Sequence, residues 1–566
     1  MRRPPNIFYG VDDKPPHGVT VLSGLQHVGL ISIILVYPLL VTREAGLSSQ
    51  ASQDVLSLSM IVLGIGAILQ VLPRGFIGAR LLCPPTFTAA YLAPSLIAVK
   101  TGGLSLVLGM TAFGGVIALG LSRVLRPLRP YFPSEISGLV VVMIGIAVGA
   151  LGLRSVVGGT TSQSISEHLT VAAITLGTMV GLNIWTKGAP RLFCALFGMI
   201  VGYLIAAVAG MTTAEDFAAI HSAPFAGVPG IGHLGWSFDL GSVVPFLVAA
   251  FATCIRTMGD VTTAQKINDA DWVRPDMRSI SGGVLANGLS NITAGLLGTV
   301  GVSTYTSSVG LAGATGIVSR RVGFAIGGIF IVLAFLPKAS AFLVIMPGPV
   351  VGAALLFSAS VIFVNGLQIV TSRMLDARRT FVIGLSFMFG LAVDLQPQSF
   401  AGMPAELLPF VSSSLVLATV SALLLNAIFR LGVRRTRTLD VVPAQFNAVA
   451  VEEFIEAQGA SWGARRDVIE RASFNLVQSI ETIIDGCNPT GMLTIEATFD
   501  EFSLDVRVSY EGAPLDLPDK RPTNEEIMAS EDAQRKLAGF MLRRHADRVA
   551  ATHKDGRSTI LFHFDH

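Results

Sequence analysis

The chain has 566 residues, of which 51% are hydrophobic and only 14% are charged, and its mean hydropathy is +0.63. Soluble proteins carry roughly a quarter charged residues, so this composition indicates a membrane protein. The formal net charge of +2 is too small to favour nucleic acid as a partner. The four cysteines show no CxxC or Cys/His spacing, which argues against both a disulfide scaffold and a zinc site.

The N-terminal residues 1–18 are polar and proline-rich and lack the small-residue cleavage site of a signal peptide. We therefore expect a short segment followed by a helix that is retained. Apolar runs of about 17–25 residues can each cross a bilayer, and we expect fourteen of them here. They lie at 19–41, 56–73, 78–98, 101–122, 135–155, 168–186, 190–210, 241–258, 279–297, 300–318, 322–340, 341–363, 380–395 and 404–430.

Two of these runs are irregular. The third contains CPPTFT at 83–88, and prolines inside a span remove backbone donors and break the helix. The tenth contains a rapid succession of Gly, Ser and Thr between 301 and 308. The third and tenth runs occupy equivalent places if the chain consists of two repeats of seven.

The charges of the connecting loops indicate the orientation. Lys and Arg gather in the connections after even-numbered spans, whereas those after odd-numbered spans hold little beyond Arg43, Lys100 and Arg154. Positively charged loops stay on the cytoplasmic side of a membrane. We therefore expect the even-side loops and both termini to be cytoplasmic, in a multi-pass protein of the inner membrane.

The character of the chain changes after the last span. Residues 440–566 are charged and combine helical stretches at 466–484 and 530–550 with strand-like runs at 492–499, 502–510 and 558–564. This pattern predicts a small C-terminal α+β cytosolic domain. The expected organisation is a cytoplasmic N-terminal segment (1–18), a transmembrane domain (19–430), a linker (431–445) and the cytosolic domain (446–566).

Residues 251–321 carry the strongest functional signal. Arg256 lies within an apolar span, where a charged side chain is costly and therefore indicates a functional site. The following segments are interrupted by small polar residues, which is the usual sequence indication of a transporter's binding site.

Several motifs then occur in a characteristic order, and they resemble the nucleobase–ascorbate transporter family of uracil, xanthine and uric acid permeases. They are FYGVDDKPP (8–16), GLQHVGL (24–30), TMGDVTTAQ (257–265), GGVLANGLSNITAGLLGT (282–299), STYTSSVGLAGATG (303–316) and PGPVVGAALL (347–356). The resemblance covers roughly residues 7–430. It implies an all-α polytopic membrane protein with fourteen transmembrane helices in two inverted repeats of seven. A core domain would move against a gate domain, and the third and tenth helices would be interrupted.

The chain departs from this family at the residues that matter most. A glutamate on the family's eighth helix binds the nucleobase, and the matching position here is Arg256. A ninth-helix acidic residue corresponds to Asn287, and the tenth-helix Gln-Asn or Glu-Asn pair corresponds to Ser307 and Ser308. The glycine and threonine of that signature remain, as Gly310 and Thr315, which we expect to support the site. The carboxylates associated with proton coupling and with binding substrate N–H groups are thus replaced.

Arg256 changes the expected chemistry of the site. A guanidinium only donates hydrogen bonds, in a fork that suits carboxylates and other oxyanions. Two half-helix N-termini at the broken spans would also favour negative charge. An anionic or acceptor-rich substrate therefore fits better than neutral uracil. The alternative is that Arg256 pairs with Asp260, about one turn away, and serves only the structure; Asp260 itself is expected to tie the eighth helix to its cytoplasmic loop.

Other residues complete the expected site. Gln26 and His27 match the family's first-helix QH motif and would support the site through hydrogen bonds, although a lone helix histidine is often structural. Thr86, Phe87 and Thr88 follow the proline break, where the family stacks a nucleobase. Ordinary packing is the alternative for Phe87, and close helix packing is the alternative for small residues such as Ser307 and Ser308.

The C-terminal region has a resemblance of its own. Its order of elements and the EGAPLDLP run (511–518) resemble the histidine-kinase-like ATPase domains of anti-sigma factors. The positions that should hold the magnesium-binding asparagine and the adenine-binding aspartate hold Ile480 and Glu511. We therefore expect no cofactor, including ATP, and interpret this region as a degenerate regulatory or dimerisation module.

The leading functional interpretation is a secondary active transporter for a nucleobase or an oxopurine such as xanthine or urate, working by alternating access. A membrane sensor that signals through the C-terminal domain, or a carrier of small organic or inorganic anions, is the alternative. The expected partners are a small-molecule substrate, membrane lipids, a second copy in a homodimer and a cytosolic regulatory protein. An enzyme is not expected, because the sequence shows neither a catalytic residue set nor a metal-binding cluster.

Overall fold

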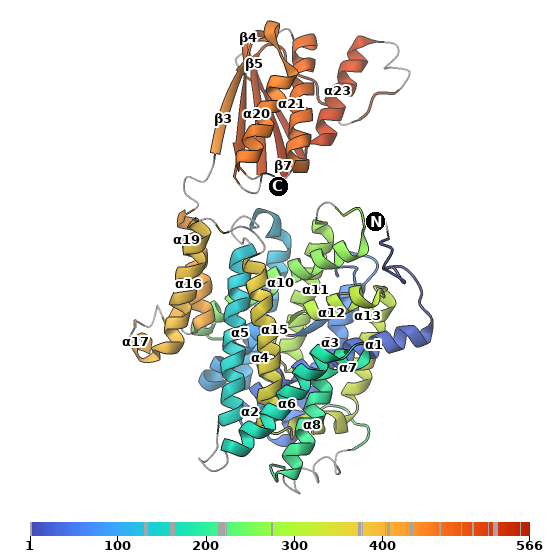
Figure 1. Ribbon diagram of the computed structural model, residues 1–566, viewed down its shortest axis with the longest axis vertical. Coiled ribbons are helices and arrows are strands. Elements are labelled where there is room, and N and C mark those ends of the chain that lie inside the picture. The colour runs from blue at the N-terminus through green and yellow to red at the C-terminus, as the bar shows by residue number, and fades with distance from the viewer. Residues whose placement is uncertain are drawn as a thin grey trace. The chain divides into compact units, whose positions relative to one another are not determined.

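The computed structural model of the chain (Figure 1) consists of two compact units, the helical unit Met1–Asn426 and the tail unit Ala427–His566. It describes residues 3–128, 134–158, 165–212, 221, 224–272, 275–371, 375, 377–401, 403–404, 408–411, 413–429, 435–462, 464, 466–487, 489–500, 503–518, 520–523, 530–554 and 556–565.

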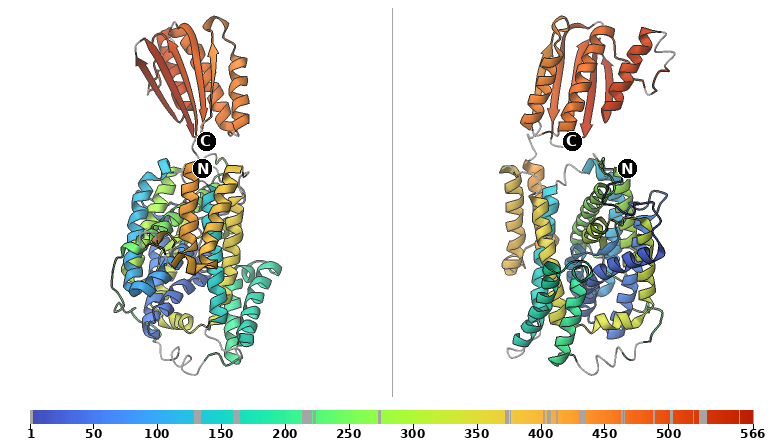
Figure 2. Two further views of the ribbon diagram at one scale, coloured as in Figure 1. Left: turned by 90° about the vertical axis from the view of Figure 1, so that its left-hand side faces the viewer. Right: turned by 45° about the vertical axis from the view of Figure 1, so that its right-hand side comes forward.

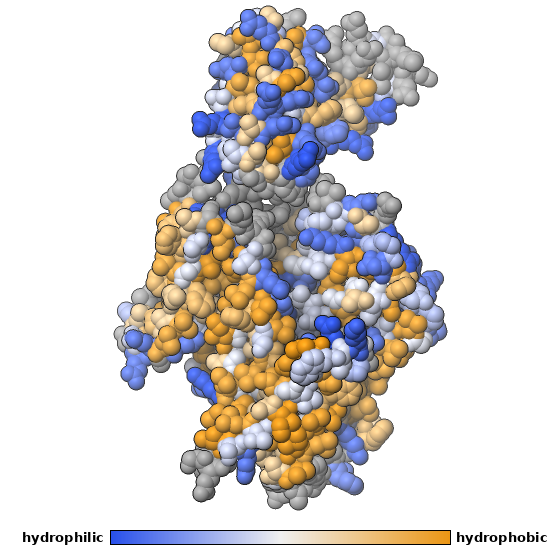
Figure 3. Space-filling view, viewed as in Figure 1, coloured by the Kyte–Doolittle hydropathy of each residue, from blue (hydrophilic) through white to orange (hydrophobic). Residues whose placement is uncertain are grey.

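Helices dominate the helical unit. Seven of those in the described residues are long and apolar enough to cross a membrane, or eight if the bent pair α13–α14 counts as one span. Figure 3 shows apolar side chains spread over the visible face of this unit, as expected for a surface in contact with lipid. The elements are α1 (His17–Ser32), η1 (Ile33–Leu35), α2 (Val36–Glu44), α3 (Ser49–Val71), β1 (Pro85–Phe87), α4 (Ala89–Leu128), α5 (Ser134–Val157), α6 (Ile165–Trp185), α7 (Ala189–Leu192), α8 (Cys194–Val208), η3 (Leu240–Ser242), α10 (Val243–Asn268), α11 (Met277–Leu297), β2 (Val302–Thr304), α12 (Thr306–Thr315), α13 (Arg320–Ala334), α14 (Pro337–Val344), α15 (Gly348–Val370), α16 (Ala377–Leu395), α17 (Pro397–Ala401), α18 (Leu408–Val411) and α19 (Ser414–Phe429).

Both irregular spans are interrupted by extended backbone. The third predicted run contains β1 and continues into α4, and the tenth contains β2 and continues into α12. The predicted third and fourth runs are joined within α4, where Gly103 has φ 69° and ψ −168° and breaks the helix. A positive φ suits glycine because it has no Cβ.

The eleventh and twelfth predicted runs, 322–340 and 341–363, are wrong in their bounds. In place of two adjacent spans, α13 ends at Ala334, the short α14 turns away by 79°, and α15 starts only at Gly348. Pro337 and Pro349 stand in the first turns of α14 and α15. A proline fits the first turn of a helix but not its interior, so it marks where a new helix starts.

Glycine allows the long helices to pack closely. A Cβ on Gly288 of α11 would lie 2.9 Å from the carbonyl oxygen of Gly115 in α4. A Cβ on Gly152 of α5 would lie 3.0 Å from the carbonyl oxygen of Gly352 in α15, and α5 and α15 pack along each other (Figure 2). Small residues are the usual means of helix association in membranes, where there is no hydrophobic drive between helices.

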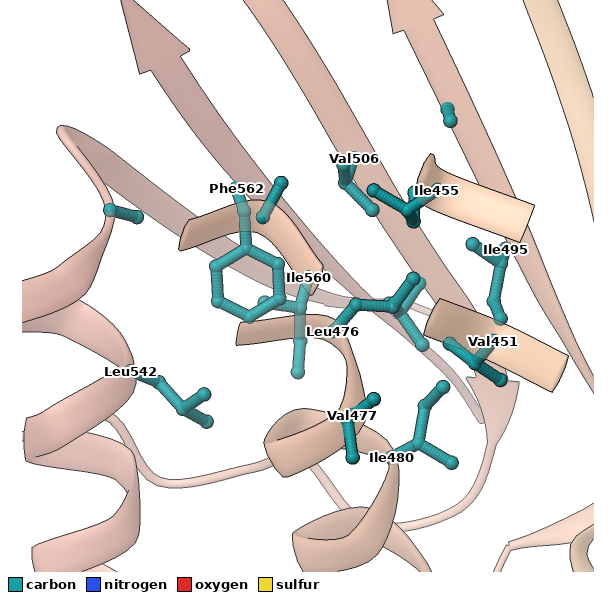
Figure 4. Packing of buried hydrophobic residues seen from close by; sticks show 14 of the residues in the cluster. Val451, Ile455, Leu476, Val477, Ile480, Ile495, Val506, Leu542, Ile560 and Phe562 are labelled. Atoms are coloured by element: carbon teal, nitrogen blue, oxygen red, sulfur yellow. The ribbon is translucent and has the colours of Figure 1, made fainter. Parts of the chain in front are cut away.

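The tail unit is an antiparallel five-stranded sheet in the order β3-β4-β5-β7-β6. Its helices cover one face, and Val451, Ile455, Leu476 and Ile480 pack against Ile495, Val506, Ile560 and Phe562 of the strands (Figure 4). The elements are β3 (Arg435–Val441), η4 (Pro443–Gln445), α20 (Ala448–Trp462), α21 (Arg466–Gly486), β4 (Thr490–Phe499), β5 (Ser503–Glu511), α23 (Glu531–His545), β6 (Arg548–Lys554) and β7 (Arg557–Asp565).

The tail unit differs from the expectation in two places. Residues 435–441 of the predicted linker form the edge strand β3, which pairs with β4, whereas 431–434 lie outside the described residues. The helix expected at 530–550 ends at His545, and 548–554 form the other edge strand, β6. Both strands are largely exposed, so neither shows the apolar alternation by which a strand is recognised in sequence.

Candidate substrate site

The two interrupted spans meet at a short antiparallel pairing. β1 pairs with β2 so that Thr86 lies opposite Ser303 and Phe87 opposite Val302. Because α4 and α12 start directly after these strands, the N-terminal ends of both half-helices lie next to the pairing. Helix N-termini present unpaired N–H groups and partial positive charge, which favours an anion or an acceptor-rich ligand there.

A buried asparagine holds this pairing to α11. The side chain of Asn291 donates a hydrogen bond to the carbonyl oxygen of Val302 at 3.0 Å and accepts one from the N–H of Val302 at 2.6 Å. The N–H of Thr88 donates to the carbonyl oxygen of Gly301 at 3.2 Å, and that of Tyr305 donates to Pro84 at 3.1 Å. Extended backbone within an apolar span needs such partners, because lipid supplies none.

Arg256 and Asp260 lie one turn apart on α10 and form a long ion pair. The distance from Arg256 Nε to Asp260 Oδ2 is 3.9 Å, and 26% of the Arg256 side chain is exposed against 4% of Asp260. The Asp260 carboxylate accepts hydrogen bonds from the hydroxyls of Thr304 at 2.6 Å and Thr306 at 2.7 Å. Among the described residues Arg256 therefore has a charge partner but no hydrogen bond, and its donors are open to another acceptor.

Asp260 thus connects α10 to the interrupted tenth span. Thr304 ends β2 and Thr306 begins α12, so the carboxylate holds the two residues that flank the break. The sequence assigned Asp260 a tie to the cytoplasmic loop, whereas the contacts tie it to β2 and α12. The reason is that the break brings two hydroxyls within reach of a carboxylate that would otherwise be buried without donors.

The first span contributes His27. Its Nδ1 forms a hydrogen bond with the hydroxyl of Ser308, and both side chains are buried. Ser307 is half-buried in the first turn of α12. Both predicted serines therefore lie at the N-terminal turn of α12, and His27 links α1 to that turn.

The remaining predicted residues are distributed around these contacts. Phe87 has 1% of its surface exposed, and Thr88 accepts a hydrogen bond from the N–H of Ala90 at the start of α4. Thr86 and Asn287 are buried and their side chains have no hydrogen-bond partner among the described residues.

Three predicted residues form no hydrogen bond with the rest of the site among the described residues. Thr315 donates only to carbonyls of its own helix, α12. Gly310 is exposed on α12, with no atom near the place where a Cβ would stand. Gln26 is half-buried on α1. Within the described ranges no group of three His, Cys, Asp or Glu side chains is arranged to hold a metal ion.

Sequence reasoning did not single out Thr304, Thr306, Tyr305 and Asn291. In the sequence, Thr304 and Thr306 were recognisable only as members of the run of small residues that indicates the break. Asn291 carried a clearer one, since an amide in the middle of an apolar span needs a polar partner.

Comparisons with known proteins agree with this architecture. Residues 18–399 match the model of the permease family (Xan_ur_permease). The chain is 29% identical to the xanthine permease XanP of Escherichia coli (strain K12), covering 75% of this chain and 94% of that protein. It is 28% identical to the putative purine permease CPE0397 of Clostridium perfringens (75% and 93%) and 24% identical to the uric acid permease PucJ of Bacillus subtilis (76% and 97%).

Solved structures support the fold alone. The overall structure of SLC26A9 matches with a TM-score of 0.50 at 13% identity, covering 76% of this chain and 69% of that chain. The murine Slc26a9 anion transporter in its inward-facing state matches with the same score and identity, covering 76% and 72%.

The family match extends over most of the chain, and the apolar helices make it a multi-pass membrane protein. Family members of this kind are transporters and not enzymes. The chain belongs to the permease family that includes the xanthine and uric acid permeases.

Proposed function

We propose that this protein is a secondary active transporter for an oxopurine, such as xanthine or urate, and that it binds the substrate in an anionic or acceptor-rich form. The observation that carries this proposal is Arg256, whose guanidinium has no hydrogen bond among the described residues and whose ion-pair partner, Asp260, bonds the two threonines that flank the start of α12. The similar relatives are named as permeases of xanthine, uric acid or purine, which supports the substrate class.

Each predicted site residue then has a proposed role. Arg256 anchors the acceptor edge of the substrate. Phe87 shapes the apolar wall. The other substrate-binding residues offer hydroxyl groups, and these are Thr86, Thr88, Ser307 and Ser308. Supporting residues surround them, and these are Gln26, His27, Asp260, Asn287, Gly310 and Thr315.

The proposed architecture is fourteen spans in two inverted repeats of seven. Its support is the equivalent placement of β1–α4 and β2–α12, each an extended segment followed by a helix. Alternating access would move a core domain, which contains both broken spans, against a gate domain. The loop charges support cytoplasmic termini and an inner-membrane location.

The parts outside the spans belong to the same proposal. We place the cytoplasmic N-terminal segment at 1–18 and the membrane domain at 19–430, followed by the linker and the cytosolic domain. A homodimer, surrounded by lipid, and a cytosolic protein that binds the tail unit complete the assembly. The tail unit is proposed as a regulatory or dimerisation module that binds no ATP.

Uptake into proteoliposomes tests the proposal. Xanthine, urate, uracil and small carboxylates are offered as labelled substrates across a pH range, with native protein, Arg256→Lys and Arg256→Glu. We expect uptake of an oxopurine by the native protein, partial retention with Arg256→Lys and loss with Arg256→Glu, because only the first two keep a positive charge.

Three results would contradict the proposal. Proton-driven uptake of neutral uracil that is unaffected by Arg256→Glu would remove Arg256 from the site. Tight oxopurine binding without net uptake would instead favour the sensor alternative. Uptake of small carboxylates without any oxopurine would favour the carrier of small anions.

A further inference from the structure

Tyr37, in the first span, has a hydroxyl group without a hydrogen-bond partner among the described residues. Tyr37 has 2% of its surface exposed, and its hydroxyl forms no hydrogen bond within the part of the chain that the structure describes. Buried tyrosine hydroxyls usually have a hydrogen-bond partner, because an unpaired hydroxyl loses its hydrogen bonds to water and gains none within the protein. This unpaired hydroxyl therefore calls for an explanation.

Tyr37 stands where the first span is irregular. The helix passes from α1 through the 3-10 turn η1 and resumes as α2, whose second residue is Tyr37. A 3-10 stretch in the middle of a helix often marks a functional site. η1 packs against β1, and α2 packs against α4, so this part of the span borders the first of the two broken spans.

The electrostatic neighbours of the phenol place it near the site. Arg256 of α10 and Tyr305, directly before α12, lie close enough to Tyr37 to act on it electrostatically, although neither forms a hydrogen bond with it. These residues come from three different spans, so the phenol and the guanidinium approach the same region from separate elements. Tyr37 is absent from the residues that the sequence motifs single out.

Other polar groups in the same region are also unpaired. Thr86 Oγ1 in β1 and both side-chain atoms of Asn287 in α11 are buried without a partner among the described residues. A site that binds a polar ligand must leave such groups available in the absence of the ligand. Thr86 lies in the strand pairing itself, and Asn287 lies one turn before Asn291, the residue that holds this pairing to α11.

We infer that Tyr37 is a substrate-specificity residue whose hydroxyl donates a hydrogen bond to an exocyclic oxo group of the substrate held by Arg256. This inference rests on the proposed oxopurine transport. A guanidinium has donors only, so the substrate edge that faces it must carry acceptors. A phenol near the same ligand adds one directed donor, and such a site rejects an analogue that lacks the matching acceptor.

The test is equilibrium binding to the purified full chain in lipid nanodiscs. The ligands are xanthine, hypoxanthine, which lacks the 2-oxo group, and 2-hydroxypurine, which lacks the 6-oxo group. For Tyr37→Phe we expect xanthine binding about 10- to 100-fold weaker, since a hydrogen bond to a charged or strongly polar group is lost. For the one analogue that lacks the oxo group read by Tyr37, native protein and Tyr37→Phe should bind equally.

Tyr91→Phe is the matched control. The Tyr91 hydroxyl is also buried and unpaired, but its ring packs on Gly301 and edge-on to Phe246, and its electrostatic neighbour is Cys254. Removing this hydroxyl should leave xanthine affinity within about twofold of the native value. Thermal unfolding of both variants verifies that neither substitution disturbs the fold.

The outcomes separate the two proposals. If the native protein binds no oxopurine, the proposed function fails. If native protein binds xanthine and Tyr37→Phe binds it equally well, only the inference about Tyr37 fails. An equal loss of affinity for all three ligands in Tyr37→Phe would also overturn the inference. That pattern would indicate a general disturbance of the site and not a hydrogen bond to one oxo group.

Discussion

Asp260 shows how a buried carboxyl group can find polar partners inside a membrane unit. Its carboxylate is 4% exposed, yet it accepts hydrogen bonds from two threonine hydroxyls and lies 3.9 Å from the guanidinium of Arg256. The carboxylate therefore depends on Thr304 and Thr306 for hydrogen bonds and on Arg256 mainly for charge. The structural interpretation of Arg256 and its role as a substrate anchor are thus compatible, because the ion pair leaves the donors of Arg256 open.

We expect removal of the Thr304 hydroxyl to lower the free energy of unfolding. Thr304→Val removes a 2.6 Å hydrogen bond to a buried carboxylate, which we expect to cost about 1.5–3 kcal/mol. Thr263→Val is the control, because the Thr263 hydroxyl is exposed and donates only to its own helix. Thermal and denaturant unfolding of the purified variants measure the difference, and an equal effect of the two substitutions would contradict the prediction.

Asn291 should be the most sensitive amide of the unit. Asn291→Ala leaves both the N–H and the carbonyl oxygen of Val302 buried without their partners, and each such group costs about 1–3 kcal/mol. We expect a large loss of thermal stability together with weaker substrate binding, since the strand pairing borders the site. Thr293→Val, which removes a hydroxyl bonded within the same helix, should have a small effect on both.

At the scale of elements, the close approach of two helices limits which side chains can replace glycine at their contact. The Cβ of a substituted Gly288 would lie 2.9 Å from the Gly115 carbonyl oxygen, so Gly288→Val must push α11 away from α4. Overpacking of this kind costs about 1–3 kcal/mol or more. Gly310→Ala on α12 meets no neighbour and should be neutral or stabilising by up to about 1 kcal/mol. Melting temperatures distinguish the two, and a stable Gly288→Val variant would show that these helices pack less tightly.

Residues 8–11 of the N-terminal segment form backbone hydrogen bonds with the C-terminal end of α12 and the residues after it, and we call them the strap. The N–H groups of Phe8 and Tyr9 donate to the carbonyl oxygen of Gly316 at 2.8 and 3.0 Å, and those of Val318 and Arg320 donate back to Tyr9 and Val11.

Deleting residues 1–11 should therefore loosen the C-terminal end of α12. Hydrogen exchange at residues 316–320 should accelerate, because these groups lose their backbone partners. Phe8→Ala is the control, since the Phe8 ring is 71% exposed and the backbone hydrogen bonds do not depend on it. Unchanged exchange in the deletion variant would contradict the assignment of a strap.

At the scale of the whole molecule, the tail unit has a core of its own. Leu476 and Ile480 of α21 are fully buried against the strands (Figure 4). We expect residues 435–566 expressed alone to unfold cooperatively, and Leu476→Ala to destabilise them by about 2–5 kcal/mol because it leaves a cavity. Circular dichroism during urea titration measures the cooperativity of unfolding and the difference in the free energy of unfolding between the two proteins. Phe474→Ala, at a ring that is 43% exposed, should cost clearly less.

Much of this architecture could be anticipated from patterns that are local in sequence. Apolar length and loop charge indicate the spans, and the prolines at 84–85 and the small residues at 301–308 indicate the two breaks. The bounds of the eleventh and twelfth runs were wrong because hydropathy does not register a bend of 79° between two equally apolar helices. The edge strands β3 and β6 were missed because an exposed strand has no apolar alternation.

The sequence by itself determined that this is a membrane protein, which spans are broken, and that an arginine, Arg256, stands within an apolar span. These features are local, since each depends on the identity of a few neighbouring residues. Only the tertiary structure decided that Asp260 serves the tenth span, that His27 bonds Ser308, and that Tyr37 is left unpaired near Arg256. The physical reason is that hydrogen-bond partners are chosen by distance in space, and these partners lie on elements far apart in the chain.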